Sequence, residues 1–250
     1  SVLLRDPDDD VAVHDDLTTY VNLTEAVMLH NLRRRFEKQE IYTQAGSVLV
    51  SLNPYTPIPR LYGEGVVRRY AQLCGGDGSS ISLPPHVFGI AARAFFTMMR
   101  ERGRSQSILV SGQSGAGKTE VTRSIVRFFA ERHTATSSIL SPRTTTATAA
   151  ATAIEKRLLH ATPLLEAFGN ALTVHNDNSS RFAKFLKINF SSSNGAITGV
   201  QIRHYLLEKA RIVTLNHNER NYHIFYWLLL HASHEERNDY QLPPVKSFSS

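Results

Sequence analysis

A glycine-rich stretch of this chain has the spacing of a phosphate-binding loop. It reads GQSGAGKT and fits the pattern G-x-x-x-x-G-K-[ST]. Its glycines allow consecutive backbone N–H groups to turn inward onto phosphate oxygens, because a Cβ atom would block those conformations. We expect Lys118 to reach the β- and γ-phosphates of a nucleotide and the Thr119 hydroxyl to bind Mg²⁺. The residues of this loop are Gly112, Gln113, Ser114, Gly115, Ala116, Gly117, Lys118 and Thr119. A glycine-rich connector that binds nothing is the alternative.

A second polar stretch could complete the chemistry of phosphoryl transfer. That reaction requires charge neutralisation at the γ-phosphate, Mg²⁺ held from two sides and a positioned water. The hydroxyls of Ser179 and Ser180, followed by Arg181, are of the right kind to complete the Mg²⁺ shell and to contact the γ-phosphate. Ser-Ser-Arg also occurs in ordinary loops that bind no ligand, which is the alternative for this stretch.

The elements that must position the phosphate loop are a strand before it and a helix after it. The apolar run at residues 107–111 predicts a buried strand. An apolar stripe at helical spacing follows the loop, formed by Val121, Ile125, Phe128 and Phe129. The N-terminus of this helix would face a bound anion with its dipole and its N–H groups.

Periodicity and turn residues predict the other elements. We expect helices from Thr24, from His86 to about Glu101, over residues 153–167 with a break at Pro163, and from Asn218 or Glu219. We expect strands over residues 47–52, 186–190 and 197–205, the last two joined by a turn at Asn194-Gly195.

Three segments are expected to be loops. Residues 53–62 contain three prolines and form a stiff loop at a strand end, where ligands of open α/β sheets bind. Residues 175–182 are too polar to continue a helix or a strand. Residues 133–153 are biased to Ser, Thr and Ala and form a disordered low-complexity loop. The basic run Arg33 to Arg35 favours a solvated helix face.

Composition narrows the class of protein. The chain has 250 residues, 42% of them hydrophobic, and a net charge of +6 spread along amphipathic segments, so nothing supports a nucleic-acid interface. A single cysteine, Cys74, excludes an internal disulfide framework and fits a reducing compartment. No apolar run approaches the roughly 18 residues of a membrane span. We expect one large domain or part of one, in a piece of a longer chain.

The order and wording of these motifs resemble the myosin motor domain. Myosin heads carry GESGAGKT as the phosphate loop and NxNSSRFGK as switch I, where this chain has GQSGAGKT and, over residues 176–184, NDNSSRFAK. The resemblance extends to LLEAFGNA at residues 164–171, YLLEKAR at 205–211 and ERNYHIFY at 219–226. Kinesins are also P-loop motors with a Ser-Ser-Arg switch I, but they lack LLEAFGNA and ERNYHIFY.

The resemblance implies residue roles that spacing alone does not. Asn53, Pro54, Tyr55 and Tyr62 correspond to the purine-binding loop, residues 53–62. Asn176 would contact the nucleotide phosphates, Ser179 would lie near the γ-phosphate and Ser180 would bind Mg²⁺. Arg181 would pair with a switch II glutamate. With Lys118, the residues Asn176, Ser179 and Arg181 form the implied catalytic set.

The resemblance also implies fold, activity and partners. The fold would be an α/β P-loop NTPase core with a central twisted mixed sheet flanked by helices, and residues 1–250 would be the N-terminal part of the motor domain. The full-length protein would be an ATPase that uses ATP and Mg²⁺ to produce force on actin filaments, mostly through regions beyond this chain. Its partners would include light chains or calmodulin, and it would be cytoplasmic, on the actin cytoskeleton.

The chain departs from the family pattern at several positions. Gln113 replaces the glutamate of the phosphate loop, Thr56 replaces a lysine of the purine loop, and Ala183 replaces the glycine of switch I. Switch II, a D-x-x-G motif, is absent, since the only aspartate after Phe182 is Asp239. The isolated chain is therefore expected to be inactive. Two alternatives stay open: a kinesin-like P-loop NTPase, and a truncated, non-catalytic nucleotide-binding or interaction fragment.

Overall fold

The computed structural model describes residues 12–73, 83–101, 103–140 and 161–243. Its contacts divide the chain into two compact units. Unit 1 comprises Ser1–Gly112, Ala116–Thr152 and Phe190–Ile197, and unit 2 comprises Gln113–Gly115, Ala153–Asn189 and Thr198–Ser250. The second to fourth residues of the phosphate loop, Gln113–Gly115, therefore group with unit 2 and its other residues with unit 1.

Unit 1 begins with a helix and a hairpin. Helix α1 (Glu25–Glu37) is capped by Thr24, whose hydroxyl accepts a hydrogen bond from the Val27 N–H, as expected for this start. Strands β1 (Tyr42–Ala45) and β2 (Val48–Ser51) pair antiparallel, preceded in the chain by the short 3₁₀ helix η2 (Leu17–Thr19). The predicted helix start at Thr24 and the predicted strand over residues 47–52 are both confirmed.

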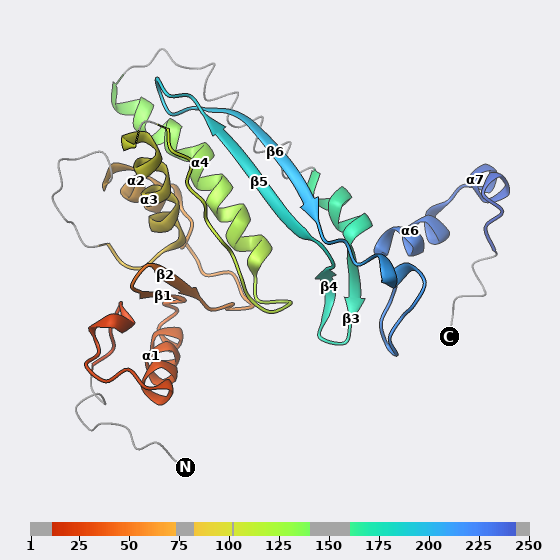
Figure 1. Cartoon of the computed structure of the whole chain (residues 1–250), viewed down its shortest axis with the longest axis horizontal. Coiled ribbons are helices and arrows are strands. Elements are labelled where there is room, and N and C mark those ends of the chain that lie inside the picture. The colour runs from red at the N-terminus through yellow and green to blue at the C-terminus, as the bar shows by residue number, and fades with distance from the viewer. Residues whose placement is uncertain (1–11, 74–82, 102, 141–160, 244–250) are drawn as a thin grey trace. The chain divides into compact units, whose positions relative to one another are not determined.

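Three further helices of unit 1 lie side by side (Figure 1): α2 (Glu64–Leu73), α3 (Val87–Arg100) and α4 (Lys118–Leu140). Their aromatic residues meet in a core in which the rings of Phe88 and Phe128 stack 5.1 Å apart, both fully buried. The predicted helix from His86 is confirmed, with the His86 Nδ1 accepting from the Phe88 N–H. This core fixes α4, whose first residue is Lys118.

Unit 2 is built from hairpins and helices. Residues 161–169 are helical and run into strand β3 (Asn170–Thr173), which pairs antiparallel with β4 (Asn176–Ser180). Strands β5 (Ala183–Phe190) and β6 (Ile197–Tyr205) form a long hairpin (Figure 1), as predicted, and its tip at Phe190–Ile197 groups with unit 1. The 3₁₀ helix η3 (Lys209–Ile212) and helices α6 (His223–His231) and α7 (His234–Asp239) follow.

A predicted strand and a predicted loop around the functional motifs were wrong. Residues 107–111 have no strand partner among the described residues, and Leu109 is 91% exposed. The polar stretch expected as a loop at 175–182 instead contains β4, because its backbone pairs with β3, with Asn170 opposite Ser180. The described residues form three two-stranded sheets, so the central mixed sheet is not seen.

Helix boundaries also differ from expectation. Helix α4 continues to Leu140, so residues 133–140 are helical and not part of a loop; residues 141–153 of that segment lie outside the described ranges. Of the helix predicted over residues 153–167, residues 153–160 lie outside the described ranges, and Pro163 lies inside the helical residues 161–169 without interrupting them. The last predicted helix begins at His223, after Asn218, whose φ of +63° is incompatible with a right-handed helix.

Candidate nucleotide-binding site

The phosphate loop has the backbone that its glycines were expected to allow. Gly115 has φ +79° and Gly117 has φ +91°, a region that residues with a Cβ atom rarely adopt. A Cβ atom built on Gly112 would lie 3.3 Å from the Cβ of Ala116, so the turn is also tight. The loop is thus shaped locally as a cradle that a side chain would fill, and this fits a bound phosphate.

Lys118 opens helix α4 directly after the loop. Its Nζ donates a 2.8 Å hydrogen bond to the Gly112 carbonyl, so the side chain folds back across the loop that precedes it. The first turn of the helix closes with the Val121 N–H donating to the Gly117 carbonyl at 3.0 Å. A cationic side chain and a positive helix end are therefore both placed at this loop, which suits an anion.

The proline-rich loop lies next to the phosphate loop within unit 1. A Cβ atom built on Gly117 would lie 3.8 Å from Cγ of Asn53. Asn53 Oδ1 accepts from the Tyr55 N–H at 2.9 Å, which fixes a local turn with Tyr55 at φ +54° and its side chain 84% exposed. Pro54, which lies between Asn53 and Tyr55 in the sequence, is half-buried. The turn thus presents an uncovered aromatic ring close to the phosphate loop.

Tyr62 differs from Tyr55, because it is packed into the protein. Its hydroxyl lies 2.7 Å from the Tyr42 hydroxyl, and its ring contacts those of His86 and Phe88 at 5.7 and 5.9 Å. Burial raises the pKa of Tyr42, and its hydrogen bond with Tyr62 adds to this effect. Burial lowers the pKa of His86 to about 4, because the charged imidazolium is disfavoured there. Tyr62 therefore anchors the end of the proline-rich loop on a neutral aromatic cluster.

In unit 2, Ser114 of the glycine-rich loop contacts the segment that the resemblance identifies with switch I, residues 176–184. The Ser114 hydroxyl donates to Ser179 Oγ at 2.9 Å, and Asn176 Nδ2 donates to Ser114 Oγ at 3.2 Å. Ser179 is 1% exposed and also accepts from Arg181 Nη1 at 3.2 Å. Ser114 thus forms one hydrogen-bonded group with three residues of the second predicted loop, although it lies 62 or more positions before them in the sequence.

Arg181 binds a carboxylate that the sequence reasoning did not assign. Its Nε lies 2.6 Å from Glu208 Oε2, and the Arg211 Nε lies 2.8 Å from the same oxygen. Arg211, whose side chain is 3% exposed, also pairs with Glu219 at 2.9 Å. The hydrogen bond from Arg181, ahead of that from Arg211, lowers the pKa of Glu208. The signal that could have indicated Glu208 is its place in YLLEKAR, the motif noted at residues 205–211.

The two hydroxyls expected to bind Mg²⁺ are both exposed. Thr119 lies in the first turn of α4, and Ser180 ends β4 opposite Asn170. Within the described ranges, no three His, Cys, Asp or Glu side chains gather closely enough to hold a metal ion. Hydroxyl ligands of this kind suit Mg²⁺ that takes its remaining oxygens from phosphates and water.

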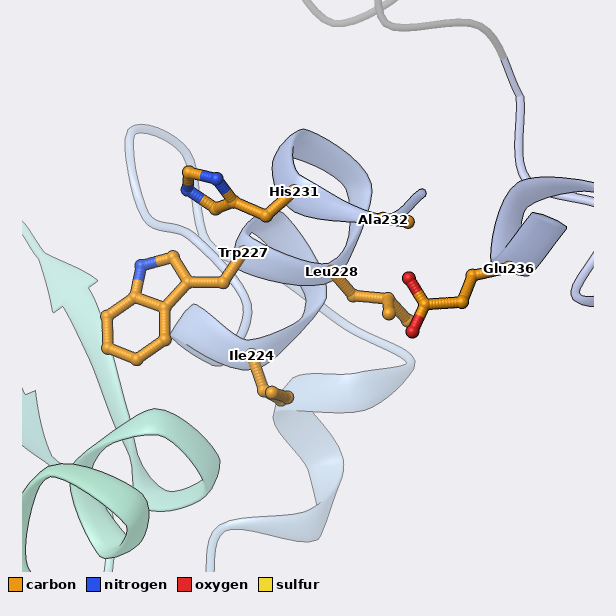
Figure 2. Close-up of a pocket in the computed structure, with 6 residues that line it drawn as sticks. All are labelled: Ile224, Trp227, Leu228, His231, Ala232 and Glu236. Carbon is orange, nitrogen blue, oxygen red and sulfur yellow. The ribbon is translucent and has the colours of Figure 1, made fainter. Parts of the chain in front are cut away.

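An open pocket elsewhere in unit 2 contains none of the predicted site residues. It lies along α6 and the start of α7 (Figure 2) and has a volume of about 450 Å³. Its lining is mainly apolar and consists of Ile224, Trp227, Leu228, His231, Ala232 and Glu236. Its lining contains no lysine or arginine and includes the carboxylate of Glu236, so it is not the candidate nucleotide site.

Comparison with known proteins identifies a family. A family model described as "Myosin head (motor domain)" matches residues 14–250. The chain is 43% identical over 249 residues to "Protein OPAQUE1" of Zea mays, 44% identical over 254 residues to "Myosin-J heavy chain" of Dictyostelium discoideum, and 41% identical over 235 residues to "Unconventional myosin-VI" of Mus musculus. These matches cover 99%, 94% and 94% of this chain.

The same matches cover a small share of each relative. The aligned region is 15% of Protein OPAQUE1, 11% of Myosin-J heavy chain and 17% of Unconventional myosin-VI. No helix in the described part of the chain is long and apolar enough to cross a membrane.

Proposed function

Since this chain belongs to the myosin head (motor domain) family, we propose that it is the ATP-binding part of an actin-based motor. The parent protein hydrolyses MgATP and couples that reaction to force on actin filaments, and it acts on the actin cytoskeleton with light chains or calmodulin bound. Residues 1–250 contribute the phosphate loop, the purine loop and switch I of an α/β P-loop core with a central twisted sheet. The kinesin-like alternative has no comparable support.

The observation that carries this proposal is the hydrogen-bonded group of Ser114, Asn176, Ser179 and Arg181. A phosphate loop alone indicates only an anion site. A serine-bearing segment held against that loop by a 2.9 Å hydroxyl contact supplies a group that can respond to the γ-phosphate. The arrangement therefore favours a nucleoside triphosphatase over a simple phosphate-binding protein.

Each residue has a role in the proposal. Lys118 neutralises charge on the β- and γ-phosphates, and the glycine-lined backbone of residues 112–117 donates N–H groups to them. Asn176 contacts the phosphates and Ser179 lies near the γ-phosphate. Asn53, Pro54 and Tyr55 contact the base, with the exposed Tyr55 ring available for stacking. Tyr62 supports that loop from the aromatic cluster.

Mg²⁺ would be held by Thr119 and Ser180 together with phosphate oxygens. The ion supplies charge stabilisation at the γ-phosphate. What the chain contributes is two neutral hydroxyl ligands, so its affinity for Mg²⁺ without nucleotide should be weak. We expect Thr119→Ala to weaken the Mg²⁺ dependence of ATP binding and to leave Mg²⁺-free nucleotide binding nearly unchanged.

The test of the proposed function is nucleotide binding by the Lys118→Ala variant of the full protein. With a fluorescent ATP analogue and excess Mg²⁺, we expect the variant to bind at least about 100-fold more weakly, because the charge-assisted contact of Lys118 with the phosphates is lost. Lys187→Ala, on the exposed face of β5, is the matched control and should bind normally. Equal affinity of Lys118→Ala and the parent protein would refute the proposal.

A further inference from the structure

Switch I is connected to helix α6 by one amide group. The Asn178 Oδ1 accepts two hydrogen bonds, one from Asn170 Nδ2 at 2.9 Å and one from His223 Nε2 at 3.1 Å. An oxygen that already accepts from an amide requires a donor on its other side, so His223 carries its proton on Nε2. The contact joins β3, β4 and the first residue of α6 within unit 2.

The N-terminus of α6 is fixed independently of this contact. Tyr222, which precedes the helix, forms a β-bridge with Ala171 of β3, and the Arg220 N–H donates to the Leu172 carbonyl at 3.0 Å. The Tyr222 hydroxyl donates to the Glu208 carbonyl at 2.7 Å. His223 therefore projects from a rigid point, and its ring can hold the Asn178 side chain in place.

The other end of the connection reaches the phosphate loop. The Asn178 N–H donates to Asn176 Oδ1 at 3.0 Å, and Asn176 Nδ2 donates to Ser114 Oγ at 3.2 Å. A continuous path of hydrogen bonds thus runs from Ser114 through the two asparagines of switch I to His223. The proposed function gives no role to Asn178 or to His223.

The path ends on a tryptophan. The imidazole of His223 stacks on the indole of Trp227 with ring centroids 5.9 Å apart and an angle of 12° between the planes. Trp227 is the single tryptophan of the chain, and its half-exposed ring borders the open pocket in Figure 2. An aromatic face responds to a ring or cation held over it, so the indole is placed to sense the position and charge of His223.

We propose that His223 is a positioning residue for switch I, which holds the Asn178 amide from helix α6 and transmits movement of switch I to Trp227. This inference rests on the proposed nucleotide site. When nucleotide occupies the phosphate loop and switch I closes on it, the Asn178–His223 contact shifts and the indole emission of Trp227 changes. Loss of the imidazole donor loosens switch I and weakens nucleotide binding, although His223 itself contacts no nucleotide.

Several charged or titratable groups surround the imidazole. Glu166, in the helical residues 161–169, favours its charged form, and Arg220 opposes it, while burial is the larger influence and lowers the pKa of His223. His231 and Glu236 line the pocket on which Trp227 borders. Any titration of Trp227 emission must therefore be compared between variants that alter only the Asn178–His223 contact.

The first experiment measures nucleotide binding and emission in the full protein. The signal of Trp227 is the difference between the protein and its Trp227→Phe variant, recorded with and without a non-hydrolysable MgATP analogue. We expect nucleotide to change this signal, and His223→Phe, which keeps an aromatic ring but no donor, to abolish the change. His223→Phe should also weaken binding by about 2- to 10-fold, the range for one neutral hydrogen bond, and His223→Gln should restore it.

The matched control is His231→Phe, a histidine on the same helix beside the same tryptophan. It should retain both affinity and the emission change. Wild-type affinity and response in His223→Phe would overturn the inference, and so would equal losses in the two variants, since those would indicate a general effect on α6. An unchanged Trp227 signal in a parent protein that does bind nucleotide would overturn it too.

A second measurement separates this inference from the proposed function. In nucleotide-free protein, Asn178→Asp places a carboxylate against His223 Nε2 and should raise the pH midpoint of Trp227 emission by a unit or more. Asn178→Ala should lower it. Failure of the parent protein to bind nucleotide would refute the proposed function, whereas equal midpoints in the parent, Asn178→Asp and Asn178→Ala proteins would refute the His223 contact.

Discussion

Glu208 is shared by two arginines, and this sharing ties switch I to the segment that follows β6. Arg181 and Arg211 both bind Oε2 of Glu208, and Arg211 is nearly fully buried. Arg211 keeps its charge, and its acidic partners offset the cost of burying that guanidinium. Glu208 therefore stabilises the fold by pairing with Arg211, and it holds Arg181 of switch I in position.

We expect Glu208→Gln to destabilise the protein by about 1–3 kcal/mol, because two charge-assisted hydrogen bonds become weaker ones. Glu219 still neutralises Arg211, which limits the loss. The free energy of unfolding in urea measures the effect. Glu235→Gln, at an exposed position of α7, is the control and should change stability by less than about 0.5 kcal/mol. Equal stabilities of the two variants would contradict the role of Glu208.

The difference in unfolding free energy between the parent protein and Glu208→Gln should also depend on pH. The folded protein lowers the pKa of Glu208 below its ordinary value of 4.5. Its contribution to stability is thus complete above about pH 4.5 and is lost as the pH falls through the lower, folded-state pKa. The stability gap between the parent and Glu208→Gln should narrow in acid, and a gap that stays constant would show that the carboxylate charge is not involved.

At the residue scale, local requirements were predictable and distant partners were not. The glycines at 115 and 117 follow from the motif, because the motif itself demands their backbone conformation. Arg35 was expected on a solvated face, but it is 4% exposed and binds Thr43 Oγ1 at 3.0 Å and the Tyr42 carbonyl at 2.9 Å. These two partners lie in β1, and Arg35 also pairs with Asp15 and Glu40, so no spacing within α1 indicates its partners.

At the element scale, several helices and the β5–β6 hairpin could be predicted, whereas strand formation around the functional loops could not. The helices from Thr24, His86 and Lys118 follow from local periodicity and caps. The polar residues of β4 have low strand propensity, yet their backbone pairs with β3, and the apolar run at 107–111 has high propensity but no strand partner in the described chain. In both cases the outcome depends on whether another segment of the chain pairs with the strand, and the local sequence pattern does not show this.

The tip of the β5–β6 hairpin depends on one glycine. Gly195 has φ +66°, and a Cβ atom there would lie 2.8 Å from Cζ of Phe95. Its carbonyl accepts from Arg132 Nη2 at 2.5 Å, and that guanidinium lies 3.4 Å above the centroid of the Phe95 ring. Backbone, aromatic ring and buried cation thus meet at one position in unit 1.

We expect Gly195→Ala to cost about 2–4 kcal/mol, because a left-handed backbone and a steric clash add together. Gly103→Ala is the control, since Gly103 has φ +84° but nothing within 4 Å of a built Cβ atom. It should lose only the backbone part, about 1–2 kcal/mol. Thermal or urea unfolding measures both, and equal losses would show that the Phe95 contact relaxes at no cost.

At the scale of the whole molecule, the chain exposes much apolar surface. Helix α6 has no buried residue, although it includes Phe225, Trp227, Leu228 and Leu230 at 38–58% exposure. Leu206 and Val213 of unit 2 are more than 80% exposed. Apolar area of this extent is typical of surfaces that contact other protein segments. Membership of a family whose members are several times longer is consistent with such contacts.

The 250-residue chain should bind nucleotide without turning it over. It holds the proposed phosphate loop and switch I, but after Phe182 these 250 residues contain no D-x-x-G motif, so we expect none of them to position the attacking water as switch II would. Phosphate release measured with purified chain and MgATP should match that of the Lys118→Ala variant, which serves as the background for contaminating ATPases. Turnover that is clearly above this background and disappears in Lys118→Ala would contradict this prediction, since these 250 residues would then suffice for hydrolysis.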